Sequence, residues 1–472
     1  MTLNLIDAAV APRRGNPRLV LFTTCLGVLI AQLDTSVVNL ALKPIGADLH
    51  LGVSTLQWVV DAYNLVYACL LLTAGTVGDL YGRRLVFASG VALFTIGSLA
   101  CGLAPSEALL IAGRAVSGLG AALMLPISLA ILAVAYPEAK ARAQAIGVWA
   151  SCYGLALAIS PTIGGLFVDA FGWRSIFLLI VPVSLLALGM TTFLPETKDP
   201  RGRSLDLPGQ VLAIAALVTL TLAAIEAPDL SPHMIWFCAG ASVLAAALFI
   251  AVEARSKGAL LPLDCLRTGS LPVAMALAAL MTFGMYAMLF LMPLYLQEQR
   301  GDSVFAAGLE LLPLSLPYVL VSRRTGVWTA RFGPFPLMTA GMGLMGAGLY
   351  CLAFLAPGRS LLTVEAELML LGIGLGLNTG PVNHVAVSSL PAARSGIASG
   401  LLNTARMLGA TLGVGVLGAL FAAHVRQASP ESFFAGLRVA FLVGGSGELL
   451  GSAIAFACAR RAALASRRFT AR

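Results

Sequence analysis

Charged residues are scarce in this 472-residue chain: Asp, Glu, Lys and Arg make up 11% of it, whereas hydrophobic residues make up 58%. Soluble domains carry about 25% charged residues, so this balance excludes an ordinary soluble globular protein. The sequence also lacks a glycine loop that ends in Lys-Ser or Lys-Thr, the motif with which many proteins bind ATP. Direct use of ATP is therefore not expected.

Signals for metal binding, disulfides or catalysis are missing as well. The eight cysteines lie mostly in apolar stretches, without paired spacing or neighbouring histidines. They are interpreted as small core residues, and no metal or cofactor is expected. A membrane-embedded enzyme stays open as an alternative, although the sequence contains no nucleophile-base pair, zinc motif or cofactor loop to support it.

Long apolar stretches are what the sequence has in abundance. A helix crosses the roughly 30 Å hydrocarbon layer with about 20 mostly apolar residues. Fourteen stretches meet this condition and predict an all-α integral membrane protein. The expected spans are 19-42, 55-78, 85-103, 107-133, 143-168, 174-194, 208-226, 233-252, 271-297, 303-322, 335-355, 362-387, 397-422 and 437-458.

The basic residues predict the orientation of these spans. An even number of spans places both termini on one side, and most of the 30 Lys and Arg residues fall on that side. Because Lys and Arg in short loops resist translocation, both termini are expected in the cytoplasm. The net charge of +8 is then explained by loops beside anionic lipid and needs no nucleic acid. The first apolar run contains Asp34 and is too long for a signal peptide, so an uncleaved helix is expected.

A short internal repeat occurs at the ends of the second and tenth spans. Gly75, Asp79 and Gly82 correspond to Gly326, Ala330 and Gly333. Two related halves are typical of secondary transporters, in which one half rocks against the other around a central site.

The first copy of this repeat resembles the signature loop of the major facilitator superfamily. In that family the loop joins helices two and three and resembles a latch that stabilises the outward-open state. The matching residues here are Gly75, Asp79, Gly82, Arg83 and Arg84, whereas Leu80 and Ala330 depart from the usual pattern.

Three further segments resemble the fourteen-helix drug:proton antiporter branch of that family. Residues 33-42, which include Asp34, are similar to its first-helix motif, with Lys43 where proline is usual. Residues 110-122, which include Arg114, are similar to its proton-transfer motif. The gate motif of the fifth span is represented by Gly154, Ser160, Pro161, Gly164 and Gly165, with Ser160 in place of a glycine.

The resemblance implies a division of the chain into six, two and six helices. The expected parts are a cytoplasmic tail (1-18), an N-terminal half (19-204), two extra helices (205-254), a C-terminal half (255-459) and a basic cytoplasmic tail (460-472).

Charges inside the spans are the candidate functional residues, because each costs several kcal/mol in lipid unless it faces a cavity or a partner. At the helical rise per residue, four of them are expected roughly 9 to 12 Å below the outer surface. These are Asp34, Asp61, Arg114 and Glu310. Asp34 and Arg114 are expected to form a proton-handling pair, with a static ion pair as the alternative. Asp61 is expected to favour cationic substrates or to open the outer vestibule, and Glu310 to line the cavity or reach the interface.

Two other charges carry a structural expectation. Arg406 and Glu448 lie at similar depth on consecutive spans and are expected to neutralise each other.

These observations predict a transporter of a bacterial cytoplasmic membrane that acts as a monomer. It is expected to export hydrophobic small molecules, with cations among them, in exchange for protons. A dedicated exporter of one metabolite or self-made antibiotic is the main alternative, since both kinds of transporter need an apolar cavity.

Overall fold

The computed structural model describes residues 16–198, 205–227, 230–256, 261, 263–267, 269–390, 395–425 and 429–470. Fourteen helical segments within these ranges are long and apolar enough to cross a membrane. The expected all-α fold with fourteen spans is confirmed. Residues 1–15 of the expected N-terminal tail and residues 471 and 472 of the expected basic tail lie outside the described residues.

The first six spans form the N-terminal half. They are α1 (Pro17–Leu49), α2 (Val53–Tyr81), α3 (Arg83–Gly102), α4 (Glu107–Ala135), α5 (Ala139–Phe171) and α6 (Arg174–Met190), which a 3-10 turn (Thr191–Phe193) extends. Local sequence fixes several of their ends. Asn16 accepts a hydrogen bond from the Arg18 amide at the start of α1 (3.0 Å), and Gly82 ends α2 with a φ of 115° that other residues rarely adopt.

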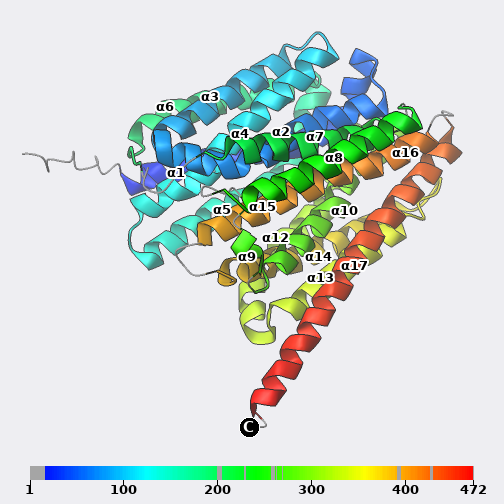
Figure 1. Cartoon of the computed structure of the whole chain (residues 1–472). Helices are drawn as coiled ribbons and strands as arrows, with labels where there is room; N and C mark the ends of the chain where they lie inside the picture. Colours follow the sequence, from blue (N-terminus) through cyan, green and yellow to red (C-terminus); the bar gives the residue numbers. More distant parts are fainter. Residues whose placement is uncertain are drawn as a thin grey trace, which may run out of the picture.

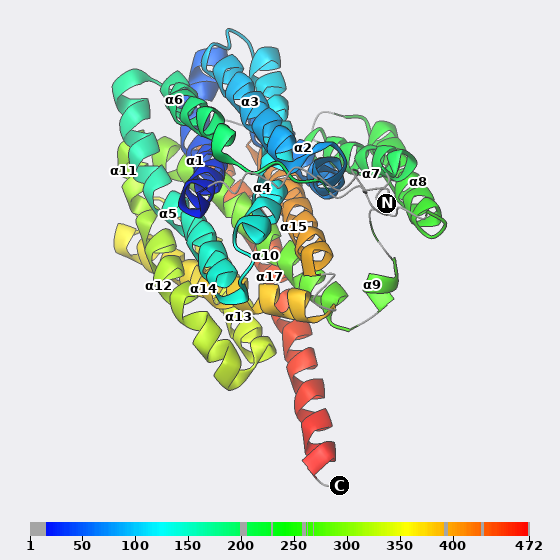
Figure 2. The same ribbon diagram turned by 90° about the vertical axis from the view of Figure 1, so that its left-hand side faces the viewer.

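Helices α7 (Leu207–Ile225) and α8 (Pro232–Glu253) lie side by side on the outside of the bundle (Figures 1 and 2). Polar contacts attach α7 to α2. The Gln210 side chain donates to the Cys69 carbonyl (2.8 Å) and accepts from the Thr73 hydroxyl. Nearer the other end of α2, the Trp58 indole donates to Glu226 at 2.7 Å.

The last six spans form the C-terminal half, which a short helix, α9 (Leu263–Arg267), precedes. Their elements are α10 (Leu271–Glu298), α11 (Val304–Glu310), α12 (Leu312–Phe332), α13 (Pro334–Leu352), α14 (Leu361–Ser388), α15 (Ser395–Leu412), a π-helical turn (Gly413–Leu417), α16 (Gly418–His424) and α17 (Pro430–Thr470). The final helix extends well beyond the rest of the bundle (Figure 1).

Two of these spans are interrupted, which the apolar pattern did not predict. The tenth span breaks at Leu311 between α11 and α12, and the thirteenth contains the π-helical turn. The tenth span also continues to Phe332, past the expected end at 322, because the helix persists through a less apolar segment with Arg323, Arg324 and Arg331.

The two ends of the bundle differ in charge. The basic end is defined here as the one with the turn at Gly82, where Arg83, Arg84, Lys140, Arg142 and the arginines of α12 lie. The other is called the opposite end.

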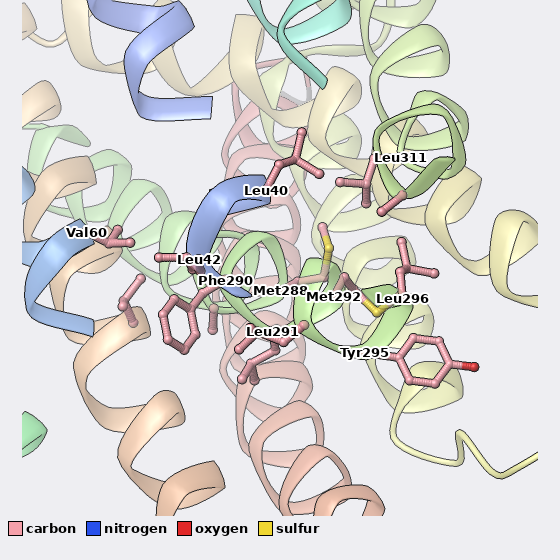
Figure 3. Packing of buried hydrophobic residues seen from close by; sticks show 14 of the residues in the cluster. Leu40, Leu42, Val60, Met288, Phe290, Leu291, Met292, Tyr295, Leu296 and Leu311 are labelled. Atoms are coloured by element: carbon pink, nitrogen blue, oxygen red, sulfur yellow. The ribbon is translucent and has the colours of Figure 1, made fainter. Parts of the chain in front are cut away.

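The hydrophobic core also differs between the ends. At the opposite end one cluster joins the halves: residues of α1 and α2 pack against α10 and Leu311, as Leu40, Leu42, Val60 and Phe290 illustrate in Figure 3. Toward the basic end the core divides into a cluster built almost entirely from the N-terminal half and another built almost entirely from the C-terminal half. The halves are therefore packed together most closely at the opposite end.

Candidate functional site

A buried ion pair between α1 and α4 forms the centre of the site. Arg114 Nη1 lies 2.5 Å from Asp34 Oδ2, and the two side chains are 1% and 0% exposed. Arg114 Nε donates to the Val59 carbonyl at 2.9 Å, and its guanidinium lies over the Tyr63 ring at 4.6 Å. The expected pairing of Asp34 with Arg114 is present in the structure. Its role in proton transfer stays a prediction.

One oxygen of the Asp34 carboxylate is not used by the ion pair. Within the described part of the chain, Asp34 Oδ1 has no hydrogen-bond partner. Arg114 cannot release its proton under physiological conditions, so the pair keeps a fixed positive charge beside a carboxylate that has capacity for one more donor. A proton or a donor group of a substrate can occupy that position.

Tyr63 of α2 lies beside this pair, and its ring centroid is 6.1 Å from that of Tyr67 and 6.4 Å from that of Phe94. It lies within electrostatic reach of Asp34, Arg114 and Tyr286 of α10. Tyr286 and Tyr318 of α12 are in turn within electrostatic reach of Arg406 on α15.

Asp61 lies on a different face of α2 from Val59 and Tyr63, the two residues of this helix that contact Arg114. It is 0% exposed, and neither of its carboxylate oxygens has a hydrogen-bond partner among the described residues. Its Oδ2 lies 3.7 Å from the position that a Cβ on Gly415 would take. One turn earlier, Gln57 Nε2 donates to the carbonyls of Val414 and Gly415 at 2.7 and 3.0 Å. These carbonyls belong to the π-helical turn, where the regular helical hydrogen-bond pattern is broken.

Glu310 is not brought to the Asp34–Arg114 pair. It ends α11 near the opposite end, where its Oε2 lies 3.9 Å from Arg300 Nε. Arg300 also lies 3.3 Å from Asp302. Both expectations for Glu310, lining of the cavity and a position at the outer interface, stay predictions.

The expected ion pair between Arg406 and Glu448 is not formed in this structure. The two residues contact different faces of α10: Thr282 donates to the Arg406 carbonyl at 2.7 Å, whereas Glu448 Oε1 lies 2.9 Å from the position of a Cβ on Gly284. Glu448 is 0% exposed, and neither of its oxygens has a hydrogen-bond partner among the described residues. Similar depth on neighbouring spans did not reveal that α10 separates them.

The candidate latch loop folds around its glycine turn. Asp79 Oδ1 accepts from Arg83 Nε and Nη2 at 3.0 and 2.8 Å. The amide of Arg83 donates to the Thr197 carbonyl (3.0 Å), and the amide of Arg84 donates to Glu196 (3.3 Å), so the segment after α6 holds the loop. Nothing lies within 4 Å of the position that a Cβ on Gly75 would occupy.

The candidate gate motif lies where α5 contacts the other half. A Cβ on Gly165 would stand 2.6 Å from the Cα of Phe305 on α11, and a Cβ on Gly308 of α11 would collide with the Pro161 carbonyl. On the N-terminal side, Gly164 fits closely against Val37 of α1. The remaining two members differ in their surroundings. Gly154 makes ordinary contact with Val319, and the Ser160 hydroxyl donates to the Ala156 carbonyl.

Several residues that join the halves at the opposite end were missed by the sequence. Asp169 of α5 accepts from the amides of Val304 and Phe305 at 3.1 and 2.9 Å, which caps the start of α11. Lys43 donates to the Gln297 carbonyl at 2.5 Å, and the Gln297 side chain donates to the Leu40 carbonyl at 2.8 Å. Lys43 carried a signal, as a departure from the family pattern, whereas Asp169 and Gln297 carried none.

Within the described ranges, no group of three or more His, Cys, Asp or Glu residues is placed to hold a metal ion. The chemistry that the site offers is the exchange of protons and hydrogen-bond donors at buried carboxylates, next to fixed guanidinium charges. A fourteen-span bundle whose two six-span halves meet around such groups is a membrane transporter.

The chain belongs to the Major Facilitator Superfamily, whose model matches residues 24–414. It is a multi-pass membrane transporter and not an enzyme.

Relatives and a solved structure agree with this assignment. The chain is 39% identical to "Multidrug resistance protein Stp" of Mycobacterium tuberculosis (strain CDC 1551 / Oshkosh) over 88% of its own length and 79% of that protein. It is 35% identical to "Tetracenomycin C resistance and export protein" of Streptomyces glaucescens, over 89% and 79% of the two chains. Its fold resembles a crystal structure of the D-xylose-proton symporter with a TM-score of 0.67, at 15% identity and with 93% and 97% of the chains covered.

Proposed function

We propose that this protein exports hydrophobic small molecules, organic cations among them, across a bacterial cytoplasmic membrane in exchange for protons. The observation that carries the proposal is the buried Asp34–Arg114 pair, in which one carboxylate oxygen has no partner among the described residues. The relatives named for drug and antibiotic resistance support the substrate class.

The proposed coupling is competition between a proton and the substrate. The Arg114 guanidinium favours the ionised form of Asp34, and a proton that arrives at Asp34 weakens that attraction. Because the two side chains come from different helices, α1 and α4, a change in their attraction alters how these helices pack. In the proposed cycle this change reaches the other half through α1, which packs against α10, and so links proton binding to the rocking of the halves.

The proposed orientation places both termini and the basic end in the cytoplasm, in accordance with the positive-inside rule. The close packing at the opposite end then corresponds to a state that is closed toward the outside. A single chain is taken as the working unit, since the two halves that pack against each other both belong to it.

A dedicated exporter of one antibiotic is the second candidate. It is favoured by the similarity to a protein named for the export of tetracenomycin C. Both candidates predict proton-coupled export and differ only in the range of substrates.

The test is transport by purified protein in liposomes with an acidic lumen. Three probes cover the range of charge: ethidium, a permanent cation; 2-naphthamide, a neutral aromatic; and 2-naphthoate, its acidic counterpart. We expect accumulation of at least one probe in the lumen, and nigericin, which collapses the pH gradient, should abolish it. Accumulation that is insensitive to nigericin, or no accumulation of any probe, would contradict the proposal. Transport of one probe alone would favour the dedicated exporter.

A further inference from the structure

A groove runs between the beginning of α1 and the first half of α5, two helices that lie next to each other (Figure 2). Its volume is about 380 Å³, within the range of about 300 to 1,000 Å³ that is usual for small-molecule sites. Apolar side chains and the thiols of Cys25 and Cys152 form its walls. Phe22 on one wall and Leu155 on the other are each 50% exposed. The groove therefore presents apolar surface that the fold itself does not cover.

The groove opens away from the space between the halves. At about 3.6 residues per turn, Cys152 and Leu155 lie on the side of α5 that points away from Gly154, which contacts α12 of the other half. Another side of α5 faces α4, because the Trp149 indole donates to the Ser128 hydroxyl (2.9 Å). The remaining direction is the outer surface of the N-terminal half, where a membrane-spanning bundle meets lipid.

One positive charge stands at the end of this groove. Arg18 lines it from the first turn of α1, at the basic end of the molecule, where the Pro17 carbonyl accepts from Tyr136 after α4 (2.9 Å). The Arg18 side chain is exposed and has no ion-pair partner within the described ranges. From Arg18 the groove follows α1 to Leu29, which is about 16 Å at the helical rise and close to half of the roughly 30 Å hydrocarbon layer. Its length thus matches one leaflet, with the charge at the level of the headgroups.

We propose that this groove binds one anionic phospholipid of the leaflet at the basic end, with an acyl chain between α1 and α5 and the phosphate on Arg18. The apolar walls suit a hydrocarbon chain, and a guanidinium binds phosphate oxygens with two parallel hydrogen bonds. A net negative headgroup is favoured because basic residues near a membrane surface attract anionic lipid. The bound lipid contacts both the helix that carries Asp34 and the helix that carries the candidate gate motif. This inference goes beyond the proposed export function and does not depend on it.

Alkylation of the two thiols in the groove reports its occupancy. Purified full-length protein in detergent is treated with N-ethylmaleimide, and mass spectrometry follows the modification of each cysteine. Three probes are compared: dioleoylphosphatidylglycerol, which is anionic; dioleoylphosphatidylcholine, which has the same chains and no net charge; and glycerophosphoglycerol, the anionic headgroup without chains.

We expect dioleoylphosphatidylglycerol to slow the alkylation of Cys25 and Cys152 by at least about fivefold, at a concentration at which dioleoylphosphatidylcholine has little effect. Glycerophosphoglycerol should not slow it, because most of the groove is apolar. Cys351, which is exposed at the opposite end, is the internal control and should react at an unchanged rate.

Two variants test the role of the charge. Arg18→Gln should make dioleoylphosphatidylglycerol no more protective than dioleoylphosphatidylcholine. Arg331→Gln is the matched control: it removes another exposed arginine of the basic end, which lies over the Phe332 ring, and should leave the difference between the lipids unchanged. Native mass spectrometry gives a second readout, in which the wild type retains one phosphatidylglycerol per chain and Arg18→Gln loses it. Both readouts compare lipids on the same protein and are therefore insensitive to a partly misfolded sample.

Equal protection by the two lipids, equal protection of Cys351, or a preference that survives Arg18→Gln would overturn the lipid site. Protection by ethidium but by neither lipid would also overturn it, because the groove would then be a path for substrates. Proton-driven accumulation of ethidium in liposomes is measured separately, so the failure of the lipid site and the failure of the proposed function are distinguishable.

Discussion

Asp34 and Arg114 owe their importance to where they lie. Each charge on its own would be costly inside the membrane, and the pair is tolerated because its members neutralise each other at 2.5 Å. Removing one partner of a buried ion pair typically costs about 3 to 5 kcal/mol, because the other charge is left without compensation. The geometry of the pair should therefore affect transport as strongly as its charge does.

Arg114→Lys tests that geometry. Lysine keeps the positive charge but cannot bridge Asp34 Oδ2 and the Val59 carbonyl as the guanidinium does at 2.5 and 2.9 Å. We expect proton-driven transport to fall by about tenfold or more, as is common when one contact of a bidentate site is lost. Initial rates in liposomes, normalised to the amount of folded protein, provide the measurement. A lysine variant with wild-type rates would show that a point charge is sufficient.

Asp61 offers a test of cation recognition. It is buried at the opposite end of the molecule, and neither of its oxygens has a hydrogen-bond partner among the described residues. The carboxylate therefore has capacity for a cationic group. We expect Asp61→Asn to lower the transport of divalent organic cations by about tenfold while monovalent cations lose less, because the second positive charge loses its counterion. Efflux of matched mono- and divalent dyes from cells checks this. Equal losses for both dyes would instead favour a role in opening the vestibule.

The sequence revealed some of these residues and not others for a physical reason. A charge within an apolar run, such as Asp34 or Arg114, is conspicuous because lipid excludes it. Tyr63, Gln57 and Asp169 are ordinary residues whose importance depends on partners far along the chain. Gln57, for example, donates to carbonyls of residues 414 and 415. Arg406 and Glu448 were noticed as charges, but their partners depend on how α10 packs between them.

At the scale of the elements, α5 is the helix that brings the halves closest together. Its residues Pro161 and Gly165 contact Gly308 and Phe305 of α11 without room for an added side chain. Asp169, one turn further on, caps α11. This crossing supports the interpretation of the α5 motif as part of a gate, whose role stays a prediction.

Gly165→Val tests that interpretation. The new side chain would start 2.6 Å from the Cα of Phe305, so the halves should no longer close fully at the opposite end. Spin labels on His50 and Ala356, in a cysteine-free background, would report the separation of the halves there. We expect the distance distribution to shift to longer values.

Gly147→Val is the control, since nothing lies within 4 Å of a Cβ at that position of α5. It should leave the distances unchanged. An unaltered distribution in Gly165→Val would mean that α11 yields and that the crossing is not a constraint.

The membrane-spanning helices were predicted well from the sequence, but the breaks within them were not. A run of about 20 apolar residues has few alternatives to a membrane helix, which is why the spans agree with expectation to within a few residues for most of the chain. The break at Leu311 and the π-helical turn at Gly413–Leu417 leave hydropathy unchanged and so escaped notice. Pro313, just beyond the break, was a usable signal, because proline disturbs the preceding turn.

At the scale of the whole molecule, the asymmetry of the core describes one state of a transport cycle. A single hydrophobic cluster holds the halves together at the opposite end, whereas the clusters nearer the basic end belong largely to one half each. Alternating access requires a second state in which the closed end opens. That transition must break the hydrogen bonds between the halves, such as those of Lys43 with Gln297 and of Gln57 with the π-helical turn.

The central claim is that Asp34 couples proton movement to substrate export, and Asp34→Asn tests it most directly when two modes of transport are compared in the same liposomes. Exchange of labelled for unlabelled ethidium needs only the rocking of the halves, whereas accumulation against a gradient also needs proton release. We predict that Asp34→Asn retains exchange within about threefold of the wild type but loses accumulation driven by a pH gradient by at least about tenfold. Gradient-driven accumulation by Asp34→Asn at the wild-type rate would contradict the account.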